Sequence, residues 1–212
     1  MASGTPPDAA LARRCRAGEP AAWNELVQRF TPLCWRLALR MLRDRAEAED
    51  ACQEAFVRVV RSFDSYDPTR PMGPWVGRIA YHVCLKRLGN KTRQRTEVQD
   101  ALLLGERTSA DGPGPEAGAA ASEAGALLES ALAELPAQDR ALVTMRYREE
   151  LSEAEMSEVT GMPVNTVKTR LHRARARLRA LLQPVLGPWK RAAPSERSRP
   201  LPGGDLEVGG EA

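Results

Sequence analysis

The segment from Pro163 to Leu182 carries polar and cationic side chains on one side and apolar side chains on the other. An apolar residue recurs every three or four positions, which predicts a helix with one narrow buried stripe. The stripe consists of Val167, Leu171, Ala174 and Leu178. The opposite side holds Asn165, Thr169, His172 and Arg173, flanked by Lys168 and Arg170. Amides, hydroxyls and imidazoles can hydrogen-bond base edges while cations neutralise phosphates, so this helix suits contact with a polyanion.

A turn and a shorter helix precede this segment. Gly161 supplies the conformational freedom that a turn needs, and Pro163 is tolerated in the first turn of a helix. Ser152 and Glu155 have the spacing of a capping box, which predicts a helix over 152–160. Helix, turn and helix together make DNA the first partner to consider. A solvated basic helix, or one half of an arginine-rich coiled coil, is the alternative.

The charge distribution suggests a second contact with a phosphate backbone. The formal net charge of +3 is too small to indicate nucleic acid by itself. However, Gly161 to Gln183 and Pro68 to Thr96 both contain cations and neither contains Asp or Glu. The cations of the second tract are Arg70, Arg78, Lys86, Arg87, Lys91, Arg93 and Arg95. Two separate basic tracts predict two backbone contacts.

No pattern typical of an enzyme or a metal site competes with this interpretation. The two histidines, His82 and His172, have no paired carboxylate at a useful spacing, and no glycine-rich phosphate loop is present. Four cysteines, Cys15, Cys34, Cys52 and Cys84, form no CxxC pair and fit reduced, buried thiols. We expect no catalytic residue, no metal and no cofactor. Without a signal peptide or a long apolar segment, we expect a cytoplasmic protein with no membrane insertion.

The elements that position these residues are all predicted to be helical. The expected helices cover 20–29, 32–43, 45–63, about 75–89, 126–134, 137–147, 152–160 and 163–182, and the acids Glu47, Asp50 and Glu54 line one side of 45–63. Composition divides the chain into a disordered tail (1–9), a helical domain (10–95), a flexible linker (96–125), a second helical domain (126–182) and a disordered tail (183–212). The predicted fold class is therefore all-α, with two small domains.

Three short motifs and their order resemble one family. AEDACQEAF (48–56) resembles the AED-x-x-Q-x-x-F signature of bacterial RNA polymerase sigma factors of the extracytoplasmic-function (ECF) group, sigma-70 family. Trp75, Arg78, Ile79 and Ala80 match its W-x-x-R-I-A segment, and TVKTRLHRARARL (166–178) resembles the end of its last domain. The resemblance covers about residues 20–182. It implies an alternative sigma factor that is not itself an enzyme.

The resemblance also implies roles for individual residues. Glu49, Asp50 and Gln53 would dock on the clamp helices of the polymerase β′ subunit. The −10 promoter element would be melted and held by the next loop and helix, with Tyr66, Arg78, His82, Lys86 and Arg87 as candidates. Tyr66 is the ring expected to be exposed, whereas Trp75 is expected in the core. The −35 element would be read by Asn165, Lys168, Thr169, Arg170, His172 and Arg173.

The implied partners are core RNA polymerase, through its β′ clamp and β subunits, promoter DNA and an anti-sigma factor. His82 stands where the family usually has Asn, and Leu85-Lys86-Arg87 also departs from its pattern, so the family's −10 preference does not transfer. Two alternatives remain at this point. One is a conventional helix-turn-helix repressor or activator whose N-terminal domain senses a signal or dimerises. The other is a polymerase-interacting protein, such as an anti-terminator, that never reads a promoter.

Overall fold

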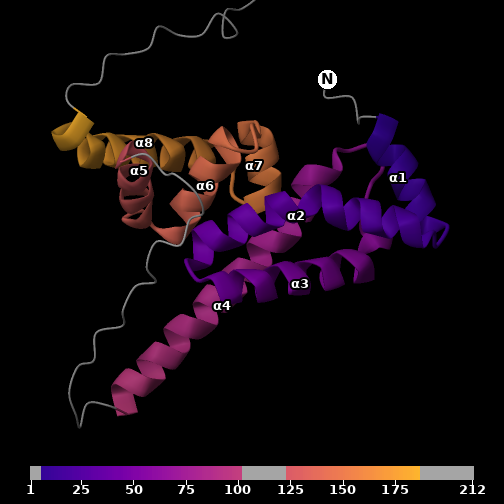
Figure 1. The fold of residues 1–212 in the computed structure, drawn as a ribbon, viewed down its shortest axis with the longest axis horizontal. Coiled ribbons are helices and arrows are strands. Elements are labelled where there is room, and N and C mark those ends of the chain that lie inside the picture. Colours follow the sequence, from indigo (N-terminus) through magenta and orange to yellow (C-terminus); the bar gives the residue numbers. More distant parts are fainter. Residues whose placement is uncertain (1–5, 102–122, 187–212) are drawn as a thin grey trace, which may run out of the picture.

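The computed structural model describes residues 6–101 and 123–186, and within these ranges every regular element is a helix (Figure 1). The predicted all-α class is confirmed. The first part of the chain forms α1 (Pro6–Arg16), α2 (Pro20–Leu42), α3 (Arg45–Arg61), the short 3₁₀ helix η1 (Phe63–Ser65) and α4 (Met72–Ala101). The second part forms α5 (Glu123–Ala133), α6 (Ala137–Tyr147), α7 (Glu153–Thr160) and α8 (Val164–Leu186). We call these two parts the N-terminal unit and the C-terminal unit.

Helix α1 begins at Pro6, so the disordered tail expected for residues 1–9 is wrong for residues 6–9. Tertiary contacts that the sequence pattern does not show hold this helix. The Asp8 carboxylate is buried, accepts a hydrogen bond from the Met72 backbone N–H at 3.0 Å and lies 2.6 Å from the Arg29 guanidinium. Residues 1–5 lie outside the described range.

Helix α2 runs without a break through Pro32, where two separate helices were predicted. A proline inside a helix costs about 3 kcal/mol. One side of α2 buries Leu26, Phe30, Leu33 and Leu37 against α3 and α4. Each such side chain contributes roughly 1.5–3 kcal/mol when it is fully buried, so the packing outweighs the cost of the proline.

Helix α3 matches its prediction closely, and α4 is longer than predicted. Asp44 caps α3 by accepting a hydrogen bond from the Glu47 N–H at 2.9 Å. Helix α4 continues past Gly89 to Ala101, and Lys91 near its middle pairs with Glu47 of α3 at 3.5 Å. The expected linker is therefore wrong for residues 96–101 and, because α5 starts at Glu123, for residues 123–125. The rest of that linker, 102–122, lies outside the described residues.

The four helices of the C-terminal unit were all predicted within a few residues. The capping box at the start of α7 is present, with Ser152 and Glu155 exchanging hydrogen bonds. Gly161 ends α7 with a φ of 72°, a left-handed conformation that glycine adopts at little cost. Helices α7 and α8 form the expected helix-turn-helix. Helix α8 extends to Leu186, so the predicted C-terminal tail is wrong for residues 183–186, and residues 187–212 lie outside the described part.

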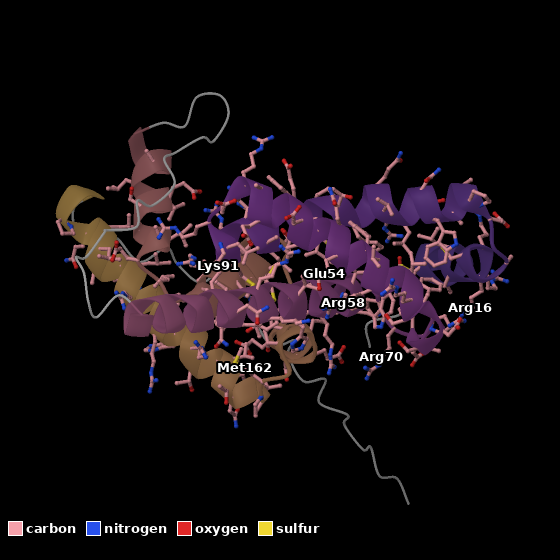
Figure 2. All side chains as sticks on the ribbon, turned by 90° about the horizontal axis from the view of Figure 1, so that it is seen from below. Arg16, Glu54, Arg58, Arg70, Lys91 and Met162 are labelled. Atoms are coloured by element: carbon pink, nitrogen blue, oxygen red, sulfur yellow. The ribbon has the colours of Figure 1, made fainter. Side chains whose placement is uncertain are left out.

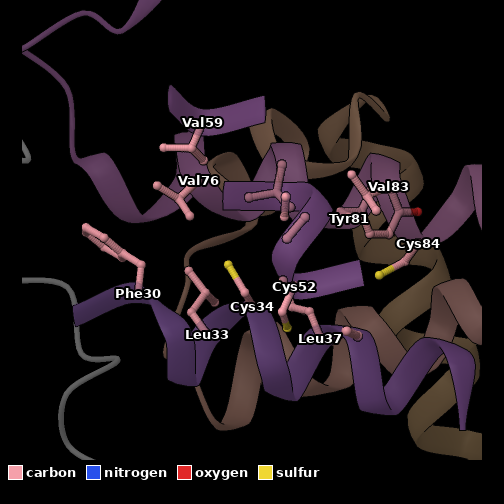
Figure 3. Packing of buried hydrophobic residues seen from close by; sticks show 14 of the residues in the cluster. Phe30, Leu33, Cys34, Leu37, Cys52, Val59, Val76, Tyr81, Val83 and Cys84 are labelled. Carbon is pink, nitrogen blue, oxygen red and sulfur yellow. The ribbon is translucent and has the colours of Figure 1, made fainter. Parts of the chain in front are cut away.

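The two units share one hydrophobic core. Helix α6 packs against α2, and α7 packs against α4 (Figure 1). Leu142, Met145, Met156 and Val159 of the C-terminal unit belong to the same buried cluster as α2, α3 and α4. Figure 3 shows part of that cluster, including Cys34, Cys52 and Cys84. A smaller cluster of Leu132, Leu135, Val143 and Ala174 lies within the C-terminal unit. The chain thus has two helical parts, as predicted, and they are docked on each other.

Candidate nucleic-acid interface

Helix α3 exposes the three residues predicted to contact a protein partner. Glu49 and Gln53 are one turn apart, and Asp50 lies beside them on the same side of the helix. All three are exposed, and the Asp50 side chain is 67% accessible. Glu49 pairs with Arg45 of its own helix at 3.4 Å. This side of α3 therefore presents two carboxylates and an amide to a partner.

The other acids of α3 face α4. Glu54 accepts hydrogen bonds from Arg87 at 3.1 and 3.2 Å and from Arg58 at 2.5 Å (Figure 2 labels Glu54, Arg58 and Lys91). Glu47 pairs with Arg87 at 3.6 Å and Lys91 at 3.5 Å. Burial alone would raise the pKa of Glu54, but the hydrogen bonds from Arg58 and Arg87 lower it overall. The predicted acidic side is therefore divided between an open surface and an internal ion-pair network.

Arg87 belongs to this network. It was predicted to contact DNA, yet its side chain is only 24% exposed and is occupied by Glu54, Glu47 and, at 3.9 Å, Asp50. Lys86, the neighbouring candidate, is exposed. Its side chain makes no hydrogen bond or ion pair with any residue in the described ranges. Lys86 is thus accessible from solvent, whereas Arg87 links α4 to α3 through its ion pairs.

A pocket of about 430 Å³ opens where α3, η1 and α4 meet. Its lining combines three guanidinium groups, two hydroxyls, an indole and an imidazole. The residues are Arg58, Arg61, Ser62, Ser65, Trp75, Arg78, Ile79 and His82. Arg78 and His82 were predicted as DNA contacts and the pocket brings them together. Partial burial and the charge of Arg78 lower the pKa of His82, so its imidazole is neutral near pH 7.

Tyr66 does not line this pocket, and the exposure expected for it is wrong. Its side chain is 2% exposed, and its hydroxyl donates a hydrogen bond to the Arg70 carbonyl at 2.6 Å. Its ring centroid lies 5.2 Å from that of Trp75 and 6.0 Å from that of Phe63. Burial raises the pKa of Tyr66 to about 12. Trp75, expected in the core, is partly exposed at the edge of this cluster and lines the pocket.

Arg61, Ser62 and Ser65 were not predicted for this site. They come from the end of α3 and from the turn that includes η1, a few residues before the acid-free tract begins at Pro68. Arg61 is a cation in the last turn of α3, where its charge interacts favourably with the helix dipole. Its position in the sequence therefore has an explanation that does not involve DNA. Only the packing of η1 against α4 reveals that these side chains adjoin Arg78.

Helix α8 presents the predicted polar surface to solvent. Asn165, Thr169, His172 and Arg173 are exposed, and Val167, Leu171 and Ala174 are buried on the other side. The Thr169 hydroxyl donates to the Asn165 carbonyl at 2.9 Å. Lys168 lies 3.7 Å from Glu153 of α7, a weak and exposed pair. The exposed side of α8 therefore carries an amide, a hydroxyl, an imidazole and a guanidinium group.

Arg170 is engaged within the protein. Its guanidinium donates to Asp139 and to Gln138 of α6, both at 2.7 Å, and its side chain is 29% exposed. It was predicted to contact DNA, whereas here it fastens α8 to α6. The guanidinium carbon of Arg175, another cation of α8, lies 5.7 Å from the centroid of the exposed Tyr147 ring. This cation–ring contact was not predicted.

Within residues 6–101 and 123–186 no group of three or more His, Cys, Asp or Glu could hold a metal ion. In the same ranges no helix has the length and apolar character needed to span a membrane. The four cysteines are free and buried, as predicted, and burial raises the pKa of Cys52 to about 11 and of Cys84 to about 12. Such thiols are poorly reactive.

Comparison with known proteins matches both units in order. The family described as Sigma-70 region 2 matches residues 26–94, and Sigma-70, region 4 matches residues 126–178. The ECF RNA polymerase sigma factor SigW of Bacillus subtilis is 32% identical over 81% of this chain and 94% of its own length. The ECF RNA polymerase sigma factor SigE of Mycolicibacterium smegmatis is 36% identical over 78% of this chain and 64% of its own.

Two solved structures have the same fold. CnrH, solved in complex with the cytosolic domain of CnrY, superposes with a TM-score of 0.59 at 23% identity and covers 84% of this chain and 98% of its own. The sigma factor RpoE of Bartonella quintana, solved with the anti-sigma factor NepR, gives a TM-score of 0.52 at 21% identity and covers 75% and 97%.

Proposed function

Because the chain belongs to the extracytoplasmic-function sigma factors of the sigma-70 family, we propose a specific division of labour among its surfaces. The protein is an alternative sigma factor: it binds core RNA polymerase and directs initiation at promoters. The repressor alternative needed a sensor or dimerisation domain, but residues 26–94 match Sigma-70 region 2. The same two matches, in order, leave no reason to prefer a polymerase-interacting protein that never reads a promoter.

Core polymerase is bound by the open side of α3. Glu49, Asp50 and Gln53 are exposed together, and the neighbouring acids are neutralised by Arg87 and Lys91. Negative charge is therefore concentrated on the outward side of the helix. A basic helical surface, such as the β′ clamp helices, is the complementary partner.

The −10 element is bound at the pocket between α3, η1 and α4. An unpaired base needs a ring to stack on and polar groups for its edge, while its phosphates need cations. Trp75 supplies the ring, and the hydroxyls of Ser62 and Ser65 supply the polar groups for the base edge. Arg61 and Arg78 supply the cations for the phosphates. The pocket is the observation that carries this assignment. Lys86 and His82 extend the surface along α4, and the neutral His82 acts as a hydrogen-bonding group.

The −35 element is read by α8. Asn165, Thr169, His172 and Arg173 face outward, and Lys168 lies beside them for the backbone. Arg170 positions the helix through Asp139 and Gln138. In this scheme Arg87 and Arg170 are positioning residues, and Tyr66 supports Trp75 from inside the aromatic cluster.

The chain itself catalyses nothing, since polymerase carries out the chemistry, and it works in the cytoplasm where polymerase and promoter DNA are found. CnrH and RpoE were solved with CnrY and NepR, respectively. By analogy an anti-sigma factor sequesters this chain as well.

Direct binding of the chain to core polymerase tests the α3 assignment. Exchanging Asp50→Asn removes an exposed charge without disturbing the buried core, so we expect an affinity loss of about tenfold in a fluorescence titration. Glu25→Gln, an exposed acid on α2, is the matched control and should bind as the unchanged protein does. Equal affinities for all three proteins would refute the assignment.

A further inference from the structure

The two walls of the pocket are joined by the turn of residues 66–71. Ser62 and Ser65 line the pocket before this turn, and Trp75 and Arg78 line it after the turn. The turn connects η1 to α4 and contains no regular element of its own. Because the connection is short, the conformation and position of the turn limit where the two walls can lie relative to each other.

Local hydrogen bonds fix the shape of the turn. Thr69 donates to the Asp67 carboxylate from its backbone N–H at 2.9 Å and from its hydroxyl at 2.7 Å. The Arg70 N–H donates to the Asp67 carbonyl at 3.1 Å, and the Tyr66 hydroxyl donates to the Arg70 carbonyl at 2.6 Å. All of these bonds lie within the turn. Its position relative to the helices therefore depends on contacts from outside.

Helix α1 supplies two such contacts, one at each end of the turn. Arg16, the last residue of α1, donates a hydrogen bond from Nη2 to the Tyr66 carbonyl at 2.7 Å (Figure 2 labels Arg16). Asp8, in the first turn of α1, accepts a hydrogen bond from the Met72 N–H at 3.0 Å. The two side chains are about two helical turns apart on one helix, so a single rigid element holds both ends.

Asp8 also caps α4 from outside that helix. Pro71, the residue before α4, has no side-chain oxygen that could accept a hydrogen bond from the first backbone N–H groups. The Asp8 carboxylate takes this role, and its negative charge suits the positive end of the helix dipole. Asp8 is 4% exposed and lies 2.6 Å from the Arg29 guanidinium of α2. The start of α4, one turn before Trp75, is therefore fixed by α1.

Helix α1 is anchored on α2 independently of the turn. Its apolar residues Leu11, Ala12 and Cys15 are buried, and α1 packs against α2. Arg14 adds an exposed hydrogen bond to Glu25 of α2 at 2.8 Å. Because these contacts do not involve the turn, removing the contact of Arg16 leaves α1 in place and frees one end of the turn.

We propose that Arg16 and Asp8 are positioning residues for base recognition at the −10 pocket, so that α1 takes part in promoter selection through the turn that it holds. The inference rests on the proposed assignment of this pocket to the −10 element. Helix α1 lies outside residues 26–94, which match Sigma-70 region 2. Polar groups discriminate between ligands only when they are held within about 0.5 Å of the productive geometry, and a turn freed at one end lets the walls shift by more.

Exchanging Arg16→Gln tests this role with little risk to the fold, because Arg16 is an exposed residue at the end of α1. Random DNA is transcribed by core polymerase with each variant, and the initiated templates are sequenced. We expect base preference in the block nearer to the start site to fall about tenfold, the effect of losing one hydrogen bond from a charged donor. The upstream block and the affinity for core polymerase should not change. Arg16→Lys keeps a charged donor and should recover part of the preference.

Arg14→Gln is the matched control. It removes a neighbouring arginine of α1 whose guanidinium binds Glu19 and Glu25, so it weakens the attachment of α1 without touching the turn. Both promoter blocks should match those of the unchanged chain. Asp8→Asn probes the other end of the turn. It keeps an oxygen that can accept from the Met72 N–H but loses the charge that faces Arg29, so we expect a smaller loss, confined to the downstream block.

The outcomes separate this inference from the proposed function. Equal downstream preference for Arg16→Gln and the unchanged chain would overturn the positioning role. An equal loss in Arg14→Gln, or a loss of core binding or of both blocks in Arg16→Gln, would also overturn it, because α1 would then act only through overall stability. A downstream block that is absent with the unchanged chain, or that survives Trp75→Ala intact, would instead contradict the assignment of the pocket.

Discussion

At the scale of single residues, the arginines of the two basic tracts differ in what their guanidinium groups contact. Arg78 and Arg173 are exposed, whereas Arg87 and Arg170 are held by carboxylates of a neighbouring helix. Sequence patterning predicted which helix each cation occupies and which side it faces. It could not distinguish a cation on an open surface from one that meets an acid on another helix, because that depends on packing between elements.

Substitutions of Arg170 and Arg173 should therefore affect different properties, the first stability and the second transcription. Arg170→Ala breaks two hydrogen bonds to Asp139 and Gln138, and we expect a loss of about 1–2 kcal/mol in the free energy of unfolding by urea. Arg173→Ala should leave that free energy unchanged and reduce only transcription that depends on the −35 element. A stable Arg170→Ala protein with a selective −35 defect would show that Arg170 binds DNA directly.

The network around Glu54 makes stability depend on pH. Hydrogen bonds from Arg58 and Arg87 hold the pKa of Glu54 below its usual value of 4.5 despite partial burial. The ionised carboxylate therefore stabilises the fold above about pH 4.5, and this stabilisation is lost as the pH falls through the lowered pKa. Glu54→Gln should be less stable than the unchanged protein at neutral pH, and the difference should shrink as the pH falls below 4.5 and through the lowered pKa.

Thermal unfolding at a series of pH values measures this effect. Glu25→Gln, which removes an exposed acid on α2, should shift the curve little at any pH. Parallel curves for Glu54→Gln and the unchanged protein would contradict the predicted linkage.

At the scale of elements, prediction worked where a helix carries its own start and stop signals. Helix α7 has a capping box and a terminal glycine, and α3 has Asp44 at its start. The same approach failed at α1, at Pro32 and beyond Gly89. There the helices are held by contacts from distant residues, such as Asp8 with the Met72 N–H, and propensity is outweighed by packing.

Asp8 offers a direct check on this explanation. Its carboxylate joins α1 to the start of α4 and to Arg29 of α2, so Asp8→Ala leaves the Met72 N–H without its buried partner. We expect a loss of about 2–4 kcal/mol in unfolding free energy and faster hydrogen exchange at the start of α4. Asp8→Asn, which keeps an acceptor oxygen, should lose less. Unchanged exchange in Asp8→Ala would mean that α1 does not stabilise α4.

The pocket illustrates the limit of prediction for the site. Its cations on α4 were found because Pro68 to Thr96 lacks acids. The contributions of Arg61, Ser62 and Ser65 depend on how η1 turns the chain back onto α4, and no local pattern encodes that turn. Tyr66 was misplaced for the same reason, since its burial against Trp75 and Phe63 is a tertiary contact.

At the scale of the whole molecule, the docking of the two units was the least predictable feature. Composition identified two helical parts and the segment between them, but both parts were expected to be tethered rather than packed. The apolar residues of α6 and α7 that meet α2 and α4 have the same spacing as residues that face an internal core. Only the structure assigns them to the contact between the units, and that contact keeps the two DNA-binding surfaces together.

Transcription from a library of random DNA, with core polymerase and the full chain, tests the central claim most directly. Sequencing the initiated templates should reveal two enriched blocks about 25 base pairs apart, and Arg173→Ala should weaken only the upstream block. Enrichment must require both the chain and core polymerase. Initiation that does not depend on the chain, or tight duplex binding by the chain with no affinity for polymerase, would contradict the account.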